Sequence, residues 1–473
     1  MGVALVLWGY EFWQWLALIQ HELLLFAGVF FLIGALDDLA IDLWWLWLKL
    51  RGRAATARLV RASLQQRDLH GPAAIFIPAW QEARVIGDTI AHILVSWPQQ
   101  ELRLYVGCYR NDPATISAAM VAAGGDARLR IVIHDRSGPS TKADCLNRLF
   151  EAMCDDERRA GKRFAMAVFH DAEDLVDPAG LGLLDRTIAD GADFVQLPVE
   201  PLPQPKSRWL GSHYCEEFAE AHGKAMVVRD ALGAALPAAG VGCAVSRSAL
   251  QRLCDRRSDR RPFSAESLTE DYELGLGVAA TGGVGRFVRA RGEDGLLIAT
   301  RAFFPSRLDH VVRQKTRWVH GIALQGWDRI GWGSGMVETW MRARDRRGPM
   351  TALVLLLGYT LMVLAALSWT AIGLGYGEPV ALSPLLKWLL IANLVFFTWR
   401  ALSRFAFTAR EYGTGEGLMA VLRIPVTNII SIMAGRRAVT AYARTLMGSA
   451  IVWDKTPHTD HPARIEPRPA GAA

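Results

Sequence analysis

The central part of the chain alternates short apolar runs with longer segments of helical periodicity. The runs are AAIFIPA (73–79), LRLYVGCY (102–109), LRIVIH (129–134), FAMAVFH (164–170) and DFVQLP (193–198), and they predict strands. Helical patterns follow most of them, for example over 83–95 and 142–160. This alternation predicts an α/β domain over 70–345, with a mainly parallel sheet covered by helices. Ligands of such sheets bind at the carboxyl ends of the strands.

The first 50 residues are apolar and rich in tryptophan, and they predict a membrane anchor. The segment Leu23–Leu36 has no charged residue and becomes long enough to span if it extends back toward Trp15. We place the acids that follow it, Asp37, Asp38 and Asp42, at or beyond the membrane boundary, because carboxylates are costly at mid-bilayer. The segment LWWLWLKLRGR (43–53) then predicts an interfacial helix. One longer helix with functional acids inside it is the alternative.

Two further apolar segments lie near the C-terminal end, and they predict two transmembrane helices over 348–400. Residues 348–377 contain no charged side chain, and 383–399 contain only Lys387 near the start. Arginines flank this pair, and the loop between the two helices has none, so the positive-inside rule places residues 50–347 and 400 onward in the cytosol.

The residues after these two predicted transmembrane helices do not have the pattern of a simple membrane span. The apolar stretch 417–435 is interrupted by Arg423 and Pro425, so we expect interfacial or re-entrant amphipathic helices over 401–455, with a full span as the alternative. The proline-rich residues 456–473 predict a flexible tail.

The composition of the chain restricts the class of protein, its partners and its redox environment. The chain is 51% hydrophobic with 17 tryptophans, which is typical of a soluble domain joined to membrane segments. The formal charge of +6 suits an anionic membrane face or a phosphate-bearing substrate, but no nucleic-acid recognition motif is present. The six cysteines lack metal-ligand spacing, which predicts reduced thiols in a cytosolic domain.

The strand predicted over 164–170 ends in crowded acids, Asp171, Glu173 and Asp174. Carboxylates at this spacing can share a divalent cation, since Mg²⁺ and Mn²⁺ take oxygen ligands from one or two carboxylates and from substrate phosphates. Asp171 and Glu173 are the first candidates for such a site. Taken alone, the sequence DAED (171–174) is also compatible with a solvent-exposed acidic turn that binds no cation.

Other strand ends and helix starts carry further polar residues. They are Glu82 in FIPAWQEARVI (76–86), Asp112 in CYRNDPAT (108–115), Lys142 in GPSTKADCLNRLF (138–150), Glu270 and Asp271 in SLTEDYELG (267–275), and Gln314, Arg317 and Trp318 in VVRQKTRWVHGIALQGW (311–327). Each motif alone is compatible with an ordinary turn, cap or amphipathic helix.

In this order the motifs resemble family 2 glycosyltransferases of the cellulose-synthase-like, GT-A kind, over about residues 70–330. The segments GALDDLAIDL (34–43), QKTRWVHGIALQGW (314–327) and VWDKTPH (452–458) are more narrowly similar to the glycosyltransferase part of the phage adsorption protein B family, known as inner-membrane proteins. The resemblance implies a GT-A, Rossmann-like cytosolic domain with flanking transmembrane helices.

The resemblance also implies roles for the candidate residues. Glu82, Asp112, Lys142 and Asp171 would bind the nucleotide-sugar donor, and Asp171 with Glu173 would hold Mg²⁺ or Mn²⁺. Glu173 stands where the family usually has Asp, so Asp174 competes for that role. Asp271 would be the catalytic base, and Gln314, Arg317 and Trp318 would contact the acceptor and the diphosphate. One base with direct displacement predicts inversion at the anomeric carbon.

We therefore expect an inner-membrane inverting glycosyltransferase that uses a nucleotide-diphosphate sugar, with UDP as the expected nucleotide, to extend a cell-surface polysaccharide, with an outer-membrane export partner. The first alternative is transfer of a single sugar to a lipid carrier. The second is a non-catalytic membrane scaffold acting in phage adsorption.

Overall fold

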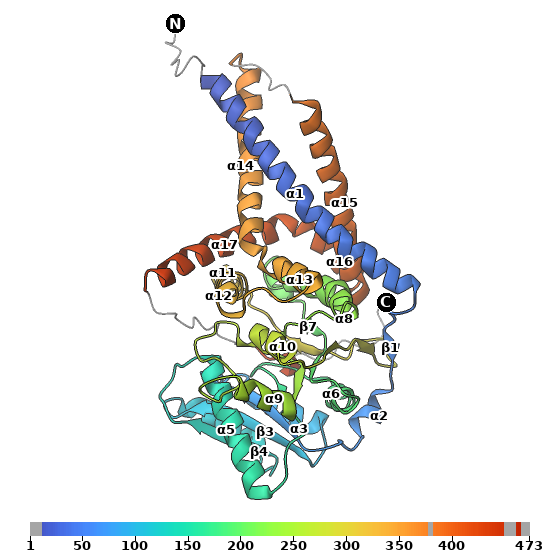
Figure 1. Cartoon of the computed structure of the whole chain (residues 1–473), viewed down its shortest axis with the longest axis vertical. Coiled ribbons are helices and arrows are strands. Elements are labelled where there is room, and N and C mark those ends of the chain that lie inside the picture. The colour runs from blue at the N-terminus through green and yellow to red at the C-terminus, as the bar shows by residue number, and fades with distance from the viewer. Residues whose placement is uncertain (1–11, 377–381, 449–459, 465–473) are drawn as a thin grey trace.

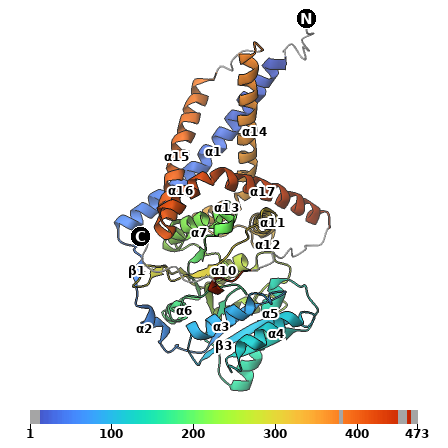
Figure 2. The same ribbon diagram turned by 180° about the vertical axis from the view of Figure 1, so that it is seen from behind.

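The computed structural model describes residues 12–376, 382–448 and 460–464, so the segment VWDKTPH lies outside the described residues. Figure 1 shows an α/β domain with three long helices, α1, α14 and α15, rising from one side of it. Two further helices, α16 and α17, lie across the base of these three, between them and the domain (Figures 1 and 2).

A seven-stranded sheet forms the centre of the domain, in the order β4-β3-β2-β5-β8-β6-β9. Its strands are β2 (Ala73–Pro78), β3 (Leu102–Tyr109), β4 (Leu129–His134), β5 (Met166–Phe169), β6 (Phe194–Gln196), β8 (Cys243–Ser246) and β9 (Gly285–Phe287). All neighbours pair in parallel except β8, which is antiparallel to both β5 and β6. The five strands predicted from apolar runs are confirmed, and the sheet is mainly parallel as expected.

Alternating side chains of the strands bury two separate cores. On β2, Ile75 and Ile77 face one core, while Phe76 faces the other. Helices α3 (Ile86–Ser96), α4 (Pro113–Ala123) and α6 (Gly180–Ala189) cover the first face. Helices α5 (Lys142–Ala160), α9 (Arg247–Asp255) and α10 (Glu270–Ala280) cover the second. The domain is therefore a three-layer α/β/α arrangement.

Short elements complete the domain. Two-stranded parallel ladders join β1 (Ala57–Arg58) to β10 (Ala290–Arg291) and β7 (Val199–Pro201) to β11 (Thr300–Ala302). The remaining helices are α2 (Arg61–Gln65), α7 (His213–Glu220), α8 (Met226–Ala231), α11 (Leu308–Trp318), α12 (Gly326–Ile330) and α13 (Met336–Arg346). π-Helical turns connect α7 to α8 and α11 to α12.

Three described helices are long and apolar enough to cross a membrane: α1 (Phe12–Leu50), α14 (Gly348–Gly373) and α15 (Pro384–Tyr412). The sequence predicted an anchor followed by an interfacial helix, with one longer helix as the alternative, and α1 is one helix of 39 residues. The helix continues because its acids have partners. Asp38 pairs with Arg347 at 2.9 Å, and Asp42 accepts a hydrogen bond from Trp399 at 2.7 Å.

Helices α16 (Thr414–Leu422) and α17 (Ile424–Leu446) meet at a bend of 52°. Arg423 lies at this bend and is fully buried, with its guanidinium 2.8 Å from Glu216 of α7 and 2.6 Å from Glu416. Pro425 falls in the first turn of α17, where its missing N–H is not needed. Arg423, the charged residue that interrupts the apolar stretch, therefore points into the protein. Its ion pair with Glu216 holds α16 and α17 against the domain.

We predict that Arg423→Met lowers the free energy of unfolding by about 3–5 kcal/mol, because Glu216 is left buried without its cation. Thermal unfolding of the purified chain in detergent measures this as a lower melting temperature. A Glu216→Leu, Arg423→Met double variant should recover part of the loss. Arg410→Met, which removes an exposed arginine 3.8 Å from Glu411, is the control and should cost under about 1 kcal/mol. Equal stability of Arg423→Met and wild type would contradict the proposed importance of this pair.

Candidate active site

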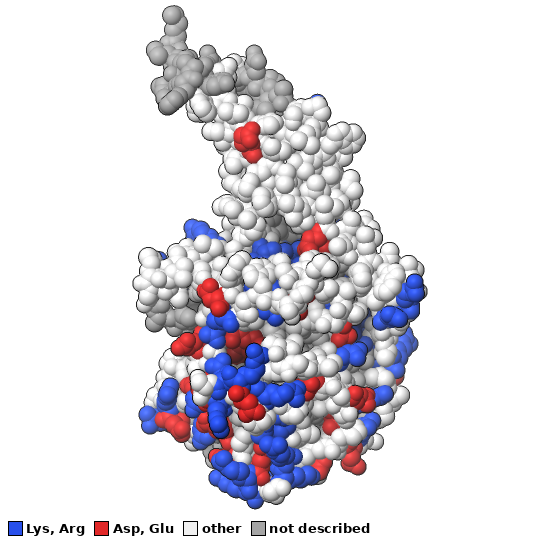
Figure 3. Space-filling view, viewed as in Figure 1, with Lys and Arg blue, Asp and Glu red and all other residues white. Residues whose placement is uncertain are grey.

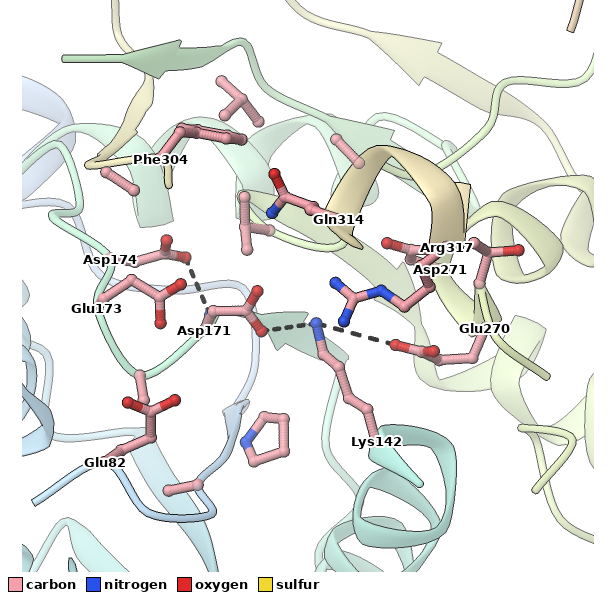
Figure 4. Close-up of a pocket in the computed structure, with 18 of the residues that line it drawn as sticks. Glu82, Lys142, Asp171, Glu173, Asp174, Glu270, Asp271, Phe304, Gln314 and Arg317 are labelled. Atoms are coloured by element: carbon pink, nitrogen blue, oxygen red, sulfur yellow. Dashed lines mark hydrogen bonds and ion pairs between the residues drawn. The ribbon is translucent and has the colours of Figure 1, made fainter. Parts of the chain in front are cut away.

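A cleft of about 1210 Å³, part of it open to solvent, lies at the carboxyl edge of the sheet. Residues from β2, β3, the turn after β5, α5, α10 and α11 line it, and Figure 4 shows charged side chains among them pointing toward one another. Seven of the sequence-predicted residues besides Lys142 line this one cleft: Glu82, Asp171, Glu173, Asp271, Gln314, Arg317 and Trp318.

Lys142 is the central cation of the cleft. It begins α5, whose start is fixed by Thr141, because the Thr141 hydroxyl accepts a hydrogen bond from the Asp144 N–H. Its Nζ lies 2.6 Å from Asp171 Oδ1 and 3.8 Å from Glu270 Oε1 (Figure 4). Burial alone would lower the pKa of Lys142, but the carboxylates of Asp171, Glu270 and Asp271 raise it above its ordinary value. Lys142 therefore stays charged.

Asp271 and Glu270 occupy the first turn of α10, where the helix dipole favours acids. Asp271 Oδ1 accepts a hydrogen bond of 2.7 Å from the Tyr272 N–H. Gly240 passes so close that a Cβ there would lie 2.6 Å from Asp271 Oδ2, and its φ of +83° also favours glycine. Burial raises the pKa of Asp271, against the effect of Lys142. Burial and the charge of Asp271 raise the pKa of Glu270 to about 7.

The acids after β5 divide into two roles. Asp174 is buried, and its carboxylate accepts hydrogen bonds from the Asp171 N–H at 3.0 Å and from His170 Nδ1 at 2.9 Å. Both bonds go to Oδ2 of Asp174 and hold the turn. The turn presents the carboxylates of Asp171, Glu173 and Asp174 to the cleft (Figure 4).

Asp112 does not line the cleft, although the resemblance implied that it would. One of its carboxylate oxygens accepts a hydrogen bond of 2.6 Å from the Gln81 N–H, and the other caps α4 by accepting from the Thr115 N–H. Thr115 in turn accepts from the Glu82 N–H at 3.0 Å. Asp112 therefore holds the turn that presents Glu82.

Helix α11 brings the three remaining candidates over the cleft. The Tyr214 hydroxyl donates a hydrogen bond of 2.6 Å to Gln314 Oε1, which fixes the amide. The ring of Trp318 packs edge-on against Tyr214, with centroids 6.0 Å apart. Arg317 faces Lys142 and Glu270 across the cleft (Figure 4). This wall offers a guanidinium, which suits phosphate groups, beside an aromatic ring.

The donor set fits a divalent cation that arrives with a phosphate ligand. Among the residues that the structure describes, no group of three or more His, Cys, Asp and Glu side chains forms a metal site. The cleft instead presents Asp171 and Glu173, and Mg²⁺ is commonly bound by one or two carboxylates together with substrate phosphates.

Several residues of the cleft were not among the predicted site residues. Glu270 was noted only as a neighbour of Asp271, and Trp80, Tyr109 and Phe304 were not singled out. Trp80 packs against Tyr109 with ring centroids 5.1 Å apart. Trp80 and Tyr109 follow or end predicted strands at the same edge of the sheet, so their place in the pattern was an available signal.

Comparison with known proteins fits this geometry. The profile of the family described as "Glycosyltransferase like family 2" matches residues 70–321, over half of the chain. The chain belongs to glycosyltransferase family 2. It is 31% identical over 461 residues to bacteriophage adsorption protein B of Escherichia coli K12 and, to the same extent, to bacteriophage N4 adsorption protein B of E. coli O157:H7. Each alignment covers 91% of this chain and 61% of the relative, so the chain spans about three fifths of their length.

The fold is also similar to that of a mannosyltransferase from Pyrobaculum calidifontis, solved in complex with GDP-Man and Mn²⁺. The TM-score is 0.50 at 15% identity, over 86% of this chain and 99% of the other. The predicted GT-A domain with flanking apolar helices and the predicted resemblance to phage adsorption protein B are both confirmed.

A segment near the C-terminus supports the acidic turn of this glycosyltransferase from behind. His461 is fully buried, so the prediction of a loose tail over 456–473 does not hold for the part described. Its Nδ1 accepts a hydrogen bond from the Ala463 N–H, so Nε2 donates to Thr89 Oγ1 at 3.1 Å. The Thr89 hydroxyl then donates to the Ala172 carbonyl at 2.6 Å. Burial lowers the pKa of His461 to about 4, which keeps it neutral.

We predict that His461→Ala increases hydrogen–deuterium exchange at the backbone amides of residues 171–174. The variant removes the partner of Thr89 and costs about 1–3 kcal/mol, so the turn should open more often. Arg464→Ala removes an exposed ion pair of 2.7 Å with Asp88 and a hydrogen bond of 2.6 Å to the Arg84 carbonyl, both away from the turn; it is the control and should change exchange little. Unchanged exchange in His461→Ala would show that the segment does not support the turn.

Proposed function

We propose that this family 2 glycosyltransferase transfers a sugar, with inversion, from a nucleotide-diphosphate donor to the hydroxyl of a growing cell-surface polysaccharide. One observation carries the proposal: Asp271 and the pair formed by Lys142 and Asp171 face the same cleft. This arrangement supports a proton acceptor and a diphosphate-binding group acting in one cavity.

In the proposed mechanism, Asp271 takes the proton of the attacking hydroxyl as the oxygen bonds to the anomeric carbon. Burial supports this role because it raises the pKa of Asp271 and so makes the carboxylate a better proton acceptor. Lys142 and Arg317 supply positive charge for the departing diphosphate, and Trp318 supplies an apolar ring face for a sugar. The bond from the anomeric carbon to the diphosphate oxygen breaks in the same displacement.

We infer that Asp171 and Glu173 hold Mg²⁺ or Mn²⁺. When bound, the cation would neutralise charge on the diphosphate leaving group. Both carboxylates follow β5 and line the cleft, and Asp174 holds their turn. The P. calidifontis mannosyltransferase, solved with Mn²⁺ and GDP-Man, supports a metal and a nucleotide sugar here by analogy.

A membrane location is part of the proposal. Three apolar helices adjoin the domain, and charged side chains, Lys and Arg among them, lie where the mostly uncharged bundle meets it (Figure 3). This distribution supports a bacterial inner-membrane protein with its catalytic domain in the cytoplasm. A product destined for the cell surface would then need an export partner in the outer membrane.

A donor screen with the purified chain tests the proposal and its substrates. We predict release of nucleoside diphosphate from a UDP-sugar in the presence of Mn²⁺, and loss of release with EDTA. GDP- and TDP-sugars are the comparison. Sizing the labelled product separates extension of a polymer, seen as a ladder, from a single transfer to lipid. Release that is unchanged by EDTA would contradict the metal assignment.

We predict that Asp271→Asn lowers turnover by about 10²–10⁴-fold, because the variant cannot accept the proton. Donor binding, measured separately by titration with UDP, should be retained. Asp190→Asn is the matched control, since its carboxylate is 72% exposed and lies outside the cleft. Wild-type turnover in Asp271→Asn would refute the base assignment, and a wild-type protein without turnover would favour a scaffold role.

We predict that activity falls as the pH drops through a range well above the ordinary pKa of a carboxyl group. Asp271 must be ionised to act as a base, burial raises its pKa, and Glu270 next to it has a pKa of about 7. A profile of kcat/KM against pH measures this loss of activity on the acid side, called the acid limb. Its apparent pKa describes Glu270 and Asp271 together, because the two carboxyl groups interact. Glu270→Gln removes a like charge and should move the limb to lower pH. An acid limb near pH 4 in the wild type would contradict the proposed environment.

A further inference from the structure

A second and larger cavity lies between the long helices and the domain. It contains about 2860 Å³ of space including its open side, and α1, α14, α15 and the start of α17 form its walls. Apolar side chains dominate the part between the helices, among them Leu24, Phe31, Leu355, Met362, Leu390 and Phe397. From Leu390 to Arg404 the groove follows roughly 20 Å of the α15 axis.

The end of this groove next to the domain is charged. Five basic and three acidic side chains line it: Lys224, Arg344, Arg347, Arg400 and Arg404, with Asp38, Glu217 and Glu220. Figure 3 shows basic side chains at this junction, below the mostly uncharged bundle. The groove thus combines an apolar channel with an excess of positive charge at one end.

Most of these charges already have partners. Arg344 lies 3.0 Å from Asp38, and Arg400 lies 2.8 Å from Glu220. Arg404 is different: it lines the groove, is half-buried, and makes no hydrogen bond or ion pair with any residue that the structure describes. The charge of Arg404 acts on Glu216, Glu217 and Glu220 from beyond ion-pair distance. These acids form ion pairs with other residues, Glu216 with Arg423, Glu217 with Lys315 and Glu220 with Arg400.

An unpaired guanidinium at the end of an apolar channel matches one class of ligand. Guanidinium binds phosphate oxygens in a fork geometry, and a hydrocarbon chain suits walls of Leu, Phe and Met. A sugar polymer does not suit them, because its hydroxyl groups would lose hydrogen bonds to water without replacement.

We propose that this groove holds one anionic glycerophospholipid, with its phosphate on Arg404 and an acyl chain between α1, α14 and α15. The lipid is a resident ligand rather than an acceptor, because no residue lines both this groove and the active-site cleft. On α7, Phe218 faces the cleft and Glu217 faces the groove, so this helix separates the two. The bound lipid would fasten the domain to the membrane helices.

The test uses the full chain purified in detergent and titrated with phosphatidylglycerol, with phosphatidylcholine as the zwitterionic comparison. Native mass spectrometry and the melting temperature measure binding. We expect phosphatidylglycerol to bind the wild type about tenfold or more tightly than Arg404→Gln, as expected for loss of one charge-assisted contact. Arg410→Gln, on the same helix but outside the groove lining, is the matched control and should bind like wild type.

Further experiments distinguish a bound phospholipid from free phosphate and from a lipid acceptor. Ala365→Trp fills the channel away from Arg404 and should weaken lipid binding while glycosyl transfer persists. Inorganic phosphate alone should not raise the melting temperature. Equal binding of the two lipids, unchanged binding in Arg404→Gln, or full replacement by inorganic phosphate would overturn the proposal. Transfer of sugar onto the bound lipid would overturn its resident role. All binding readouts are independent of the proposed glycosyl transfer.

Discussion

The arrangement of the cleft depends on one electrostatic constraint, the concentration of carboxylates around Lys142. Asp171, Glu270 and Asp271 come from segments a hundred residues apart, and burying them together is unfavourable without a cation. Lys142 supplies that charge from the start of α5, 2.6 Å from Asp171. A metal-bound diphosphate would enter a site that already carries fixed charges of both signs, so little reorganisation would be needed when the sugar is transferred.

Helix α11 connects this chemistry to the membrane layer. One side of α11 presents Gln314, Arg317 and Trp318 to the cleft, while Val311 packs with Ile430 of α17 in a common apolar cluster. The buried pair of Arg423 and Glu216 holds the same layer against α7. The helices that lie across the base of the bundle are therefore part of the active-site scaffold, which gives a physical reason for the joining of catalytic domain and membrane helices in one chain.

Sequence patterns predicted the local features and missed those set by distant contacts. The apolar runs gave five strands correctly, and α5 begins and ends at the predicted residues 142 and 160. The antiparallel strand β8 was not among the predicted strands. Asp112 was expected in the cleft but caps α4 instead, and the role of His461 depends on a contact with Thr89, 372 residues away. No local pattern encodes such a pairing.

The central claim is that Asp271 drives a single displacement at the anomeric carbon without a covalent sugar–enzyme intermediate. The most direct measurement is the anomeric configuration of the first product, determined by NMR from a donor of known configuration. We predict inversion of the configuration. Retention of configuration would contradict it, because retention requires a second displacement or a front-face path for which Asp271 is not the base.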